Sequence, residues 1–164
     1  MREDVFTLVG LMKAHVPEFR NCHITSIAPA VGIRESRRIR GMHVLTGQEY
    51  VTAHKFPDAV ARACHPVDIH LPGSEGQLLT FPEDAGYIPY RCLIADEYPN
   101  LLVAGRCISA DAEAFAAIRV QAPCMETGQA AGIAAAMCCE RNIAVQAVDT
   151  DALTAAVRAE GSVI

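Results

Sequence analysis

The sequence has no tryptophan and few aromatic or charged residues. Aromatic residues make up 5% of the 164 positions and charged residues 20%, whereas hydrophobic residues reach 51%. Disordered chains are polar and highly charged, so this composition predicts a folded chain with a buried core, of ordinary single-domain size. The apolar excess leaves two interpretations open. One is a compact, alanine-rich domain, and the other is a domain with one face that packs on further polypeptide.

A basic surface and a long apolar run are also missing. The formal net charge is -5, whereas nucleic-acid binding normally needs a basic face, so we expect no nucleic-acid partner. The longest apolar run covers residues 130–139 and is about half as long as a membrane-spanning helix. The N-terminus shows no signal-peptide pattern. We therefore expect no membrane partner and a cytoplasmic protein.

The seven cysteines contain no CxxC pair. Disulfide scaffolds belong to shorter secreted chains, so we expect reduced thiols. Cys22-His23 and Cys64-His65 do not favour a zinc site, because neighbouring side chains on a strand point to opposite faces. We expect no metal, and we expect Cys138 and Cys139 to pack as small apolar residues on a helix.

The glycines lack the spacing of a dinucleotide-binding turn. No two of the eleven are spaced as Gly-x-Gly, which excludes the Gly-x-Gly-x-x-Gly turn that holds a pyrophosphate at a helix N-terminus. Tight binding of a dinucleotide by these residues alone is therefore not expected.

Apolar spacing and capping residues predict four helices. They span residues 4–14, 57–63, 127–139 and 151–160. Pro17 ends the first helix, and Pro57 suits the first position of the second. Asp149 or Thr150 caps the last helix, and Gly161 stops it.

Short extended runs are expected between these helices. They cover residues 23–27, 37–45, 67–71, 77–81 and 101–104. The last run is continuously apolar and lies between Pro99-Asn100 and Gly105, which fits a buried strand of a parallel sheet. Ligands usually bind at the C-terminal end of such a strand. These elements together predict an α+β fold.

The order of motifs between Asn100 and Gly132 is the most informative feature. The chain reads Asn100-Leu-Leu-Val-Ala-Gly-Arg106, Cys107-Ile-Ser109, Arg119-Val120 and Gly128-Gln-Ala-Ala-Gly132. In this order the motifs resemble the C-terminal part of FAD-dependent oxidoreductases with a glutathione-reductase-like flavin domain. Further support comes from residues 32–39, 68–70 and 88–91, so the resemblance covers about residues 32–161.

The resemblance implies that the apolar strand returns the chain to the FAD domain and that the following loop and helix contact the flavin. It assigns cofactor binding to Gly105, Arg106, Arg119, Gly128, Gln129, Ala130, Ala131 and Gly132. A helix that begins at residues 127–129 would present unpaired N–H groups to a pyrophosphate or a reduced flavin. Spacing alone favours a purely structural Gly/Ala helix, and the preceding strand with Gly105-Arg106 favours the flavin contact.

The resemblance also divides the chain and implies a partner. Residues 1–98 become a β-rich substrate-side portion with an N-terminal helix, and residues 99–164 the closing strand and helices of the FAD-binding domain. FAD would need the missing N-terminal segment, supplied by a longer enzyme or a separate chain. The alternative is a truncated, non-catalytic relative that acts as an interaction module. A homo-oligomer is left open. An iron-sulfur cluster needs ligands from elsewhere, because Cys107 and Cys124 supply two of its usual four thiolates.

Three residues are candidates for the substrate side of a hydride transfer to flavin. Arg34 suits an anionic substrate group, because a guanidinium matches a carboxylate in a bidentate way. Alternation along an extended segment places Arg34, Arg38 and Arg40 on one face and Arg37 with Glu35 on the other. We expect Arg40 to be surface charge.

The other two candidates are His70 and Arg91. Asp68 and His70 share a face of the expected strand, so the carboxylate would orient the imidazole for proton transfer, although an exposed pair is an equal alternative. Arg91 either faces the same cavity as a substrate ligand or is a structural ion-pair partner.

Overall fold

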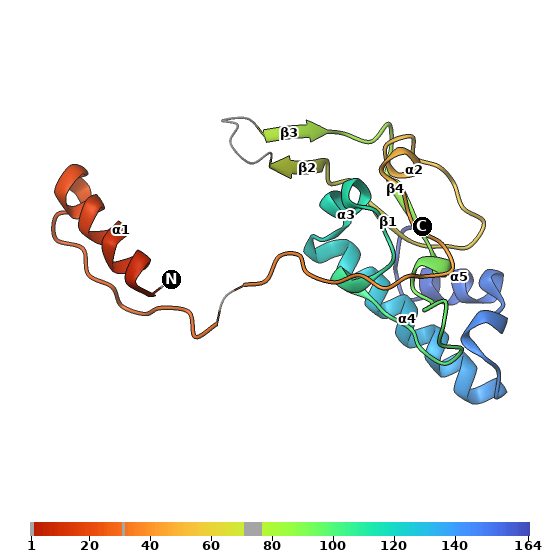
Figure 1. The fold of residues 1–164 in the computed structure, drawn as a ribbon. Helices are drawn as coiled ribbons and strands as arrows, with labels where there is room; N and C mark the ends of the chain where they lie inside the picture. Colours follow the sequence, from red (N-terminus) through yellow and green to blue (C-terminus); the bar gives the residue numbers. More distant parts are fainter. Residues whose placement is uncertain (1, 31, 71–76) are drawn as a thin grey trace. The chain divides into compact units, whose positions relative to one another are not determined.

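The computed structural model describes residues 2–30, 32–70 and 77–164, except for the side chains of His70 and Gln77. The chain divides into two compact units, Met1–Ile33 and Arg34–Ile164. In the first unit, α1 (Arg2–His15) confirms the helix predicted over residues 4–14 (Figure 1). A division between residues 98 and 99 into a substrate side and a flavin side stays a prediction.

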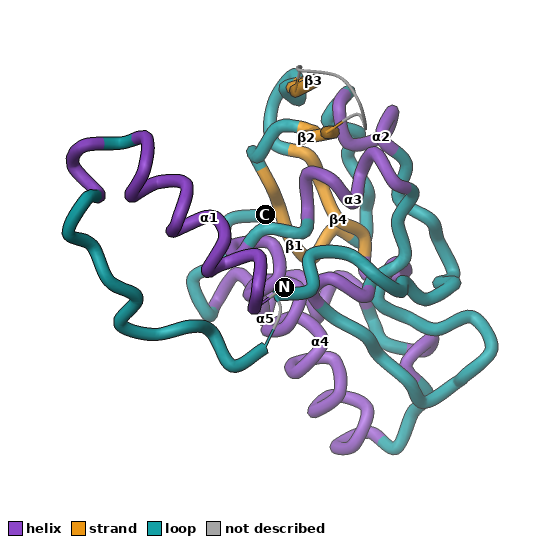
Figure 2. The backbone as a smooth tube through the Cα atoms, turned by 60° about the vertical axis from the view of Figure 1, so that its left-hand side comes forward, coloured by secondary structure: helices purple, strands orange, loops and turns teal. Residues whose placement is uncertain are grey.

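The second unit combines helices with two small antiparallel sheets. Within the described residues, its helices are α2 (Gly47–Val51), α3 (Ala112–Ile118), α4 (Gln121–Arg141) and α5 (Thr150–Ala159). Strand β1 (Ala59–Ala63) pairs with β4 (Gly86–Pro89), and β2 (Val67–His70) pairs with β3 (Gln77–Thr80). Figure 2 shows both strand pairs beside the helices. The predicted α+β class is confirmed.

The core lies where the helices meet these sheets. Helices α4 and α5 pack on β1, α3 packs on β2, and α2 packs on both α3 and β4. Tyr50 of α2 is fully buried, and a Cβ atom on Gly86 would overlap its ring, so only glycine fits at this point of β4. The Tyr50 hydroxyl lies 2.7 Å from the His65 carbonyl oxygen and 3.0 Å from that of Ala63, and its single proton is shared between them, which holds α2 at the end of β1.

The helix expected over residues 57–63 is wrong, because this segment contains β1. Its residues pair with β4 and are buried on both faces of the sheet, apart from the half-buried Arg62. Burial and pairing therefore override the helix propensity of its alanines. The strands expected over residues 67–71 and 77–81 are confirmed as β2 and β3, with Leu71 outside the described residues.

The buried parallel strand expected over residues 101–104 is also wrong. Residues 96–100 turn the chain back on itself, so Leu102 forms an isolated antiparallel bridge with Ile94. The Val103 N–H donates to the Leu93 carbonyl oxygen at 2.8 Å. A connection this short joins antiparallel neighbours, whereas a parallel pair needs a longer crossover.

Helix α4 begins at Gln121, six residues before the expected start. Pro123 occupies its first turn, where a residue without an N–H group is tolerated, and Asn142 ends the helix in the left-handed conformation with φ 51°. The last predicted helix is confirmed as α5. The Asp149 carboxylate caps it, and Gly161 follows it with φ 94°.

Candidate functional site

Two arginine and carboxylate pairs line a small cavity in the second unit, which we call the arginine cavity. Its volume is about 230 Å³, and it is lined by Arg34, Glu35, Asp68, Ile69, Ala112, Ala116 and Arg119. These residues come from the extended segment at residues 34–40, from β2 and from α3 with its C-terminal cap. The structure thus brings together two of the predicted site residues, Arg34 and Arg119.

Arg34 and Arg119 both bind β2 at Asp68. The Arg34 Nη2 atom lies 3.1 Å from the Asp68 carboxylate, and Arg119 Nη2 donates to the Asp68 carbonyl oxygen at 3.0 Å. The Arg34 side chain is 55% exposed and that of Arg119 is 11% exposed. Arg34 is therefore the solvent-accessible guanidinium of the cavity, and Arg119 is the buried one.

Glu35 connects the buried guanidinium of Arg119 to that of Arg38. It accepts from Arg38 Nη1 at 2.6 Å and from Arg119 Nη1 at 3.2 Å. Arg38 and Arg119 also lie over the ring of the fully buried Phe115, at 4.8 and 5.9 Å from its centroid. Glu35 thus pairs with Arg38 and Arg119. The expectation that Glu35 and Arg37 share one face, opposite Arg34 and Arg38, is wrong because this segment is not a regular strand.

Burial and charge act together on Arg119. Desolvation, followed by repulsion from the Arg34 charge, lowers the pKa of Arg119 below its ordinary value, although Glu35 and Asp68 oppose this effect. A guanidinium remains charged under all ordinary conditions. Arg34 and Arg119 both bind Asp68, so two like charges are held near each other, an arrangement that an anion would relieve.

Local capping places these side chains. The Asp111 carboxylate accepts the Ala114 N–H at 2.8 Å and so begins α3, whose C-terminal cap is Arg119. The other Asp111 oxygen accepts the Gly47 N–H at 2.9 Å and ties α3 to α2. The Ile39 N–H donates to the Cys107 carbonyl oxygen at 2.9 Å, which holds the arginine segment against the loop after residue 104.

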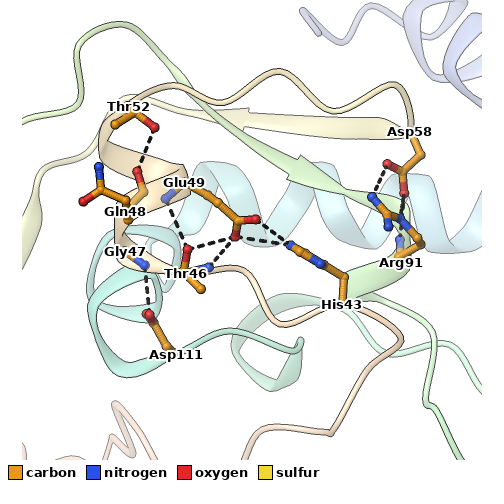
Figure 3. A network of polar contacts seen from close by, with 9 residues as sticks. All are labelled: His43, Thr46, Gly47, Gln48, Glu49, Thr52, Asp58, Arg91 and Asp111. Atoms are coloured by element: carbon orange, nitrogen blue, oxygen red, sulfur yellow. Dashed lines mark hydrogen bonds and ion pairs between the residues drawn. The ribbon is translucent and has the colours of Figure 1, made fainter.

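The structure does not place Arg91 at this cavity. Its Nε and Nη2 atoms bind the buried Asp58 carboxylate at 2.9 and 3.2 Å (Figure 3). Arg91 is therefore the structural ion-pair partner that the sequence left as an alternative. Arg40 is 83% exposed and lies 3.9 Å from Asp96, as expected of surface charge. The backbone of His70 lies in β2, but its side chain is outside the described part of the structure.

The loop of Gly105, Arg106 and Cys107 is a single 3-10 turn beside α4. Gly105 has φ 68°, a backbone conformation that favours glycine, and its N–H donates to the Thr127 hydroxyl at 3.1 Å. Arg106 and Cys107 are exposed. The loop thus presents a polar edge next to Cys124 and Thr127, near the start of α4.

The predicted cofactor residues of α4 occupy different environments. Gly128 and Gly132 are exposed, and an added Cβ atom would meet no other atom within 4 Å. Ala130 is fully buried in the core, half-buried Ala131 packs against it, and Gln129 accepts from the Ser162 hydroxyl at 3.2 Å. The helix N-terminus expected at residues 127–129 is wrong, because these residues lie inside α4, where the helix itself uses their N–H groups.

Sequence reasoning missed a second polar network, at the start of α2. Thr46 and Glu49 form a reciprocal capping box, and His43 Nε2 lies 3.1 Å from the Glu49 carboxylate (Figure 3). Burial raises the pKa of Glu49, but hydrogen bonds from Thr46 and the contact with His43 outweigh it and hold this pKa below its ordinary value. The Thr-x-x-Glu spacing was the signal that would have identified α2.

The cysteines lie in varied environments. All seven cysteines are free, and Cys139 is exposed rather than packed as expected, whereas Cys138 is half-buried. Across residues 2–30, 32–70 and 77–164, no group of three or more histidine, cysteine or acidic side chains is placed to hold a metal ion. The same residues contain no helix of the length and apolarity that crossing a membrane requires.

Comparison with known proteins identifies one family. The family model described as FAD dependent oxidoreductase matches residues 1–157. No curated protein and no solved structure matches the chain.

Proposed function

The chain belongs to the FAD-dependent oxidoreductase family, and from this membership we propose that it takes part in hydride transfer between an organic, anionic substrate and the N5 atom of a flavin. In this proposal the chain supplies the C-terminal portion of the enzyme, with a glutathione-reductase-like flavin domain. An N-terminal nucleotide-binding segment, in a longer enzyme or in a separate chain, supplies the site for the pyrophosphate.

The residues present fit one side of a flavin and not the whole cofactor. Gly128 and Gly132 leave open space along the exposed face of α4, so a planar ring can approach the helix backbone closely. The Gly105 turn contacts the same helix, and its exposed residues Arg106 and Cys107 are the part of this loop that a flavin could reach. The chain has no Gly-x-Gly turn for the phosphates, so high affinity for FAD requires the N-terminal segment.

The arginine cavity is the observation that carries the substrate side of this proposal. It places the Arg34 guanidinium, which is 55% exposed, at a hollow whose remaining wall includes Ile69 and Ala116. An accessible guanidinium beside apolar side chains is a suitable ligand for an organic anion. Arg34 is therefore the proposed substrate ligand, with His70 as the proposed acid or base.

The alternative function is a non-catalytic interaction module. The exposed face of α4 carries Met125, which is 74% exposed, together with Gly128 and Gly132. An uncharged face of this kind is also suited to helix or sheet packing with another chain. The two functions differ in one property. The enzyme would retain flavin when the nucleotide-binding segment is present, whereas the interaction module would not.

The visible absorbance of bound flavin tests the proposal. We expect no flavin on the chain alone and stoichiometric flavin on the chain purified with its nucleotide-binding segment. Gly128→Leu or Gly132→Leu should abolish this retention. Leucine favours a helix more than glycine does, so the loss would not reflect unfolding.

Ala155→Leu is the matched control, because Ala155 is exposed on α5 and away from the proposed flavin face. Its flavin content should equal that of the wild type. A complex that purifies without flavin would favour the interaction module. Full retention in both glycine variants would contradict the placement of the flavin against α4.

A further inference from the structure

The charged side chains that line the arginine cavity balance, and Arg38, which pairs with Glu35 outside the lining, adds one positive charge to the cluster. Three guanidinium groups, those of Arg34, Arg38 and Arg119, surround the two carboxylates of Glu35 and Asp68. This described cluster therefore retains one positive charge after its internal pairing. Arg119 is 11% exposed and Arg38 is 26% exposed, so water screens this part of the cluster incompletely, and a bound anion would stabilise the cluster.

The guanidiniums also retain donors for a ligand. Arg34 uses Nη2 for its bond to Asp68, and Arg119 uses Nη1 for Glu35 and Nη2 for the Asp68 carbonyl oxygen. Each guanidinium carries five N–H groups, so both have donors beyond these bonds. Arg34 binds the Asp68 carboxylate and Arg119 binds the Asp68 carbonyl oxygen, so the two guanidinium groups lie within electrostatic reach of each other.

We propose that Arg34 and Arg119 together bind the carboxylate of a small monocarboxylic acid with a short aliphatic chain. This inference rests on the proposed function, since it names the substrate class of that site. It also gives Arg119 a role in binding substrate, where the resemblance had assigned it to the cofactor.

Charge and size define this class of ligand. One excess positive charge balances one carboxylate, whereas a second carboxylate would face Glu35 and Asp68 without a counter-ion. The walls next to the arginines are Ile69, Ala112 and Ala116, which suit methyl and methylene groups. A volume of about 230 Å³ lies below the roughly 300–1,000 Å³ of pockets for drug-sized ligands.

Titration of the full chain with sodium propionate tests this binding without any flavin. The readout is the set of arginine Nε–H signals in ¹H–¹⁵N NMR spectra, measured at constant ionic strength. We expect a saturable shift in a small subset of these signals. Propionamide has the same size but no charge, so it should cause no saturable shift, and succinate should bind several-fold more weakly than propionate.

Two substitutions and one control locate the site. Arg34→Gln and Arg119→Lys should each weaken propionate binding at least about tenfold, because each removes charge-assisted hydrogen bonds. Arg40→Gln removes an exposed arginine that is not part of the cavity lining and should leave the affinity unchanged. Far-UV circular dichroism verifies that each variant folds. If Arg119→Lys does not fold, the propionate affinity of Arg34→Gln alone tests the site.

The outcomes separate this inference from the proposed function. Equal binding of propionate and propionamide, tighter binding of succinate, or unchanged affinity in Arg34→Gln would overturn the monocarboxylate site even if the assembled protein retains flavin. Absence of flavin from the assembled protein would instead refute the proposed function, while saturable propionate binding would still stand as a property of the cavity.

Discussion

Replacing Arg91 by methionine tests whether this residue stabilises the fold or binds the substrate. In the structure its guanidinium forms two hydrogen bonds with Asp58, and its backbone N–H lies 3.3 Å from the same carboxylate. Asp58 joins the start of β1 to the end of β4, because its own carbonyl oxygen accepts the Tyr90 N–H at 2.8 Å. Arg91→Met keeps a long side chain but leaves the carboxylate without its cation.

The cost follows from the unequal burial of the two partners. The Asp58 side chain is 7% exposed, whereas that of Arg91 is 43% exposed. Breaking a fully buried pair costs about 3–5 kcal/mol and breaking an exposed pair about 0–1 kcal/mol, so we expect Arg91→Met to lower the free energy of unfolding by about 2–3 kcal/mol. Asp58→Asn should cost about 1 kcal/mol, because water hydrates the half-exposed guanidinium and the amide oxygen still accepts a bond.

Urea unfolding followed by far-UV circular dichroism measures both values, since the sequence has no tryptophan for fluorescence. The double variant gives the coupling energy of the pair, which should be about 1–2 kcal/mol. Propionate affinity should stay at the wild-type value in Arg91→Met. A larger loss of stability in Asp58→Asn than in Arg91→Met would refute the burial argument, and a loss of propionate affinity in Arg91→Met would return Arg91 to the substrate site.

Two further predictions concern α2 and its surroundings. The pKa of Glu49 is held below its ordinary value of 4.5, so its contribution to stability is present above that pH and is lost as the pH falls through the lower, folded-state value. Glu49→Gln should therefore flatten the acid branch of the unfolding free energy, and an unchanged branch would contradict this. Gly86→Ala should destabilise the fold by about 1–3 kcal/mol in urea, because the new methyl group overlaps the Tyr50 ring. Gly132→Ala, where space is open, is its control and should be neutral or stabilising.

The sequence predicted best those elements whose signals are local. Asp149 and Gly161 delimit α5 as expected, because capping and a left-handed glycine act on their own helix. The β1 segment was assigned to a helix, because its conformation depends on pairing with β4, about 25 residues later in the chain. The prediction for residues 101–104 was wrong for a related reason. An apolar run does not reveal whether the segment beside it runs parallel or antiparallel.

The same distinction applies to the candidate site. Arg34 was identified by its residue type, and Arg119 by the order of motifs in the resemblance. Their meeting with Asp68 depends on α3, a helix that sequence reasoning missed although Asp111 supplies a capping residue in front of it. A site built from three segments needs all three to be placed before its geometry follows.

The early start of α4 changes how this chain can meet a flavin. A helix that began at residue 127 would direct its unpaired N–H groups at the cofactor, whereas α4 begins at Gln121, so residues 127–132 can offer only their exposed side to it. What remains at Gly128 and Gly132 is steric access for a ring. In our proposal the positive charge that binds an anion is instead that of Arg34 and Arg119. Flavin contact and anion binding are thus assigned to different parts of the chain, and the glycine and arginine substitutions should affect them separately.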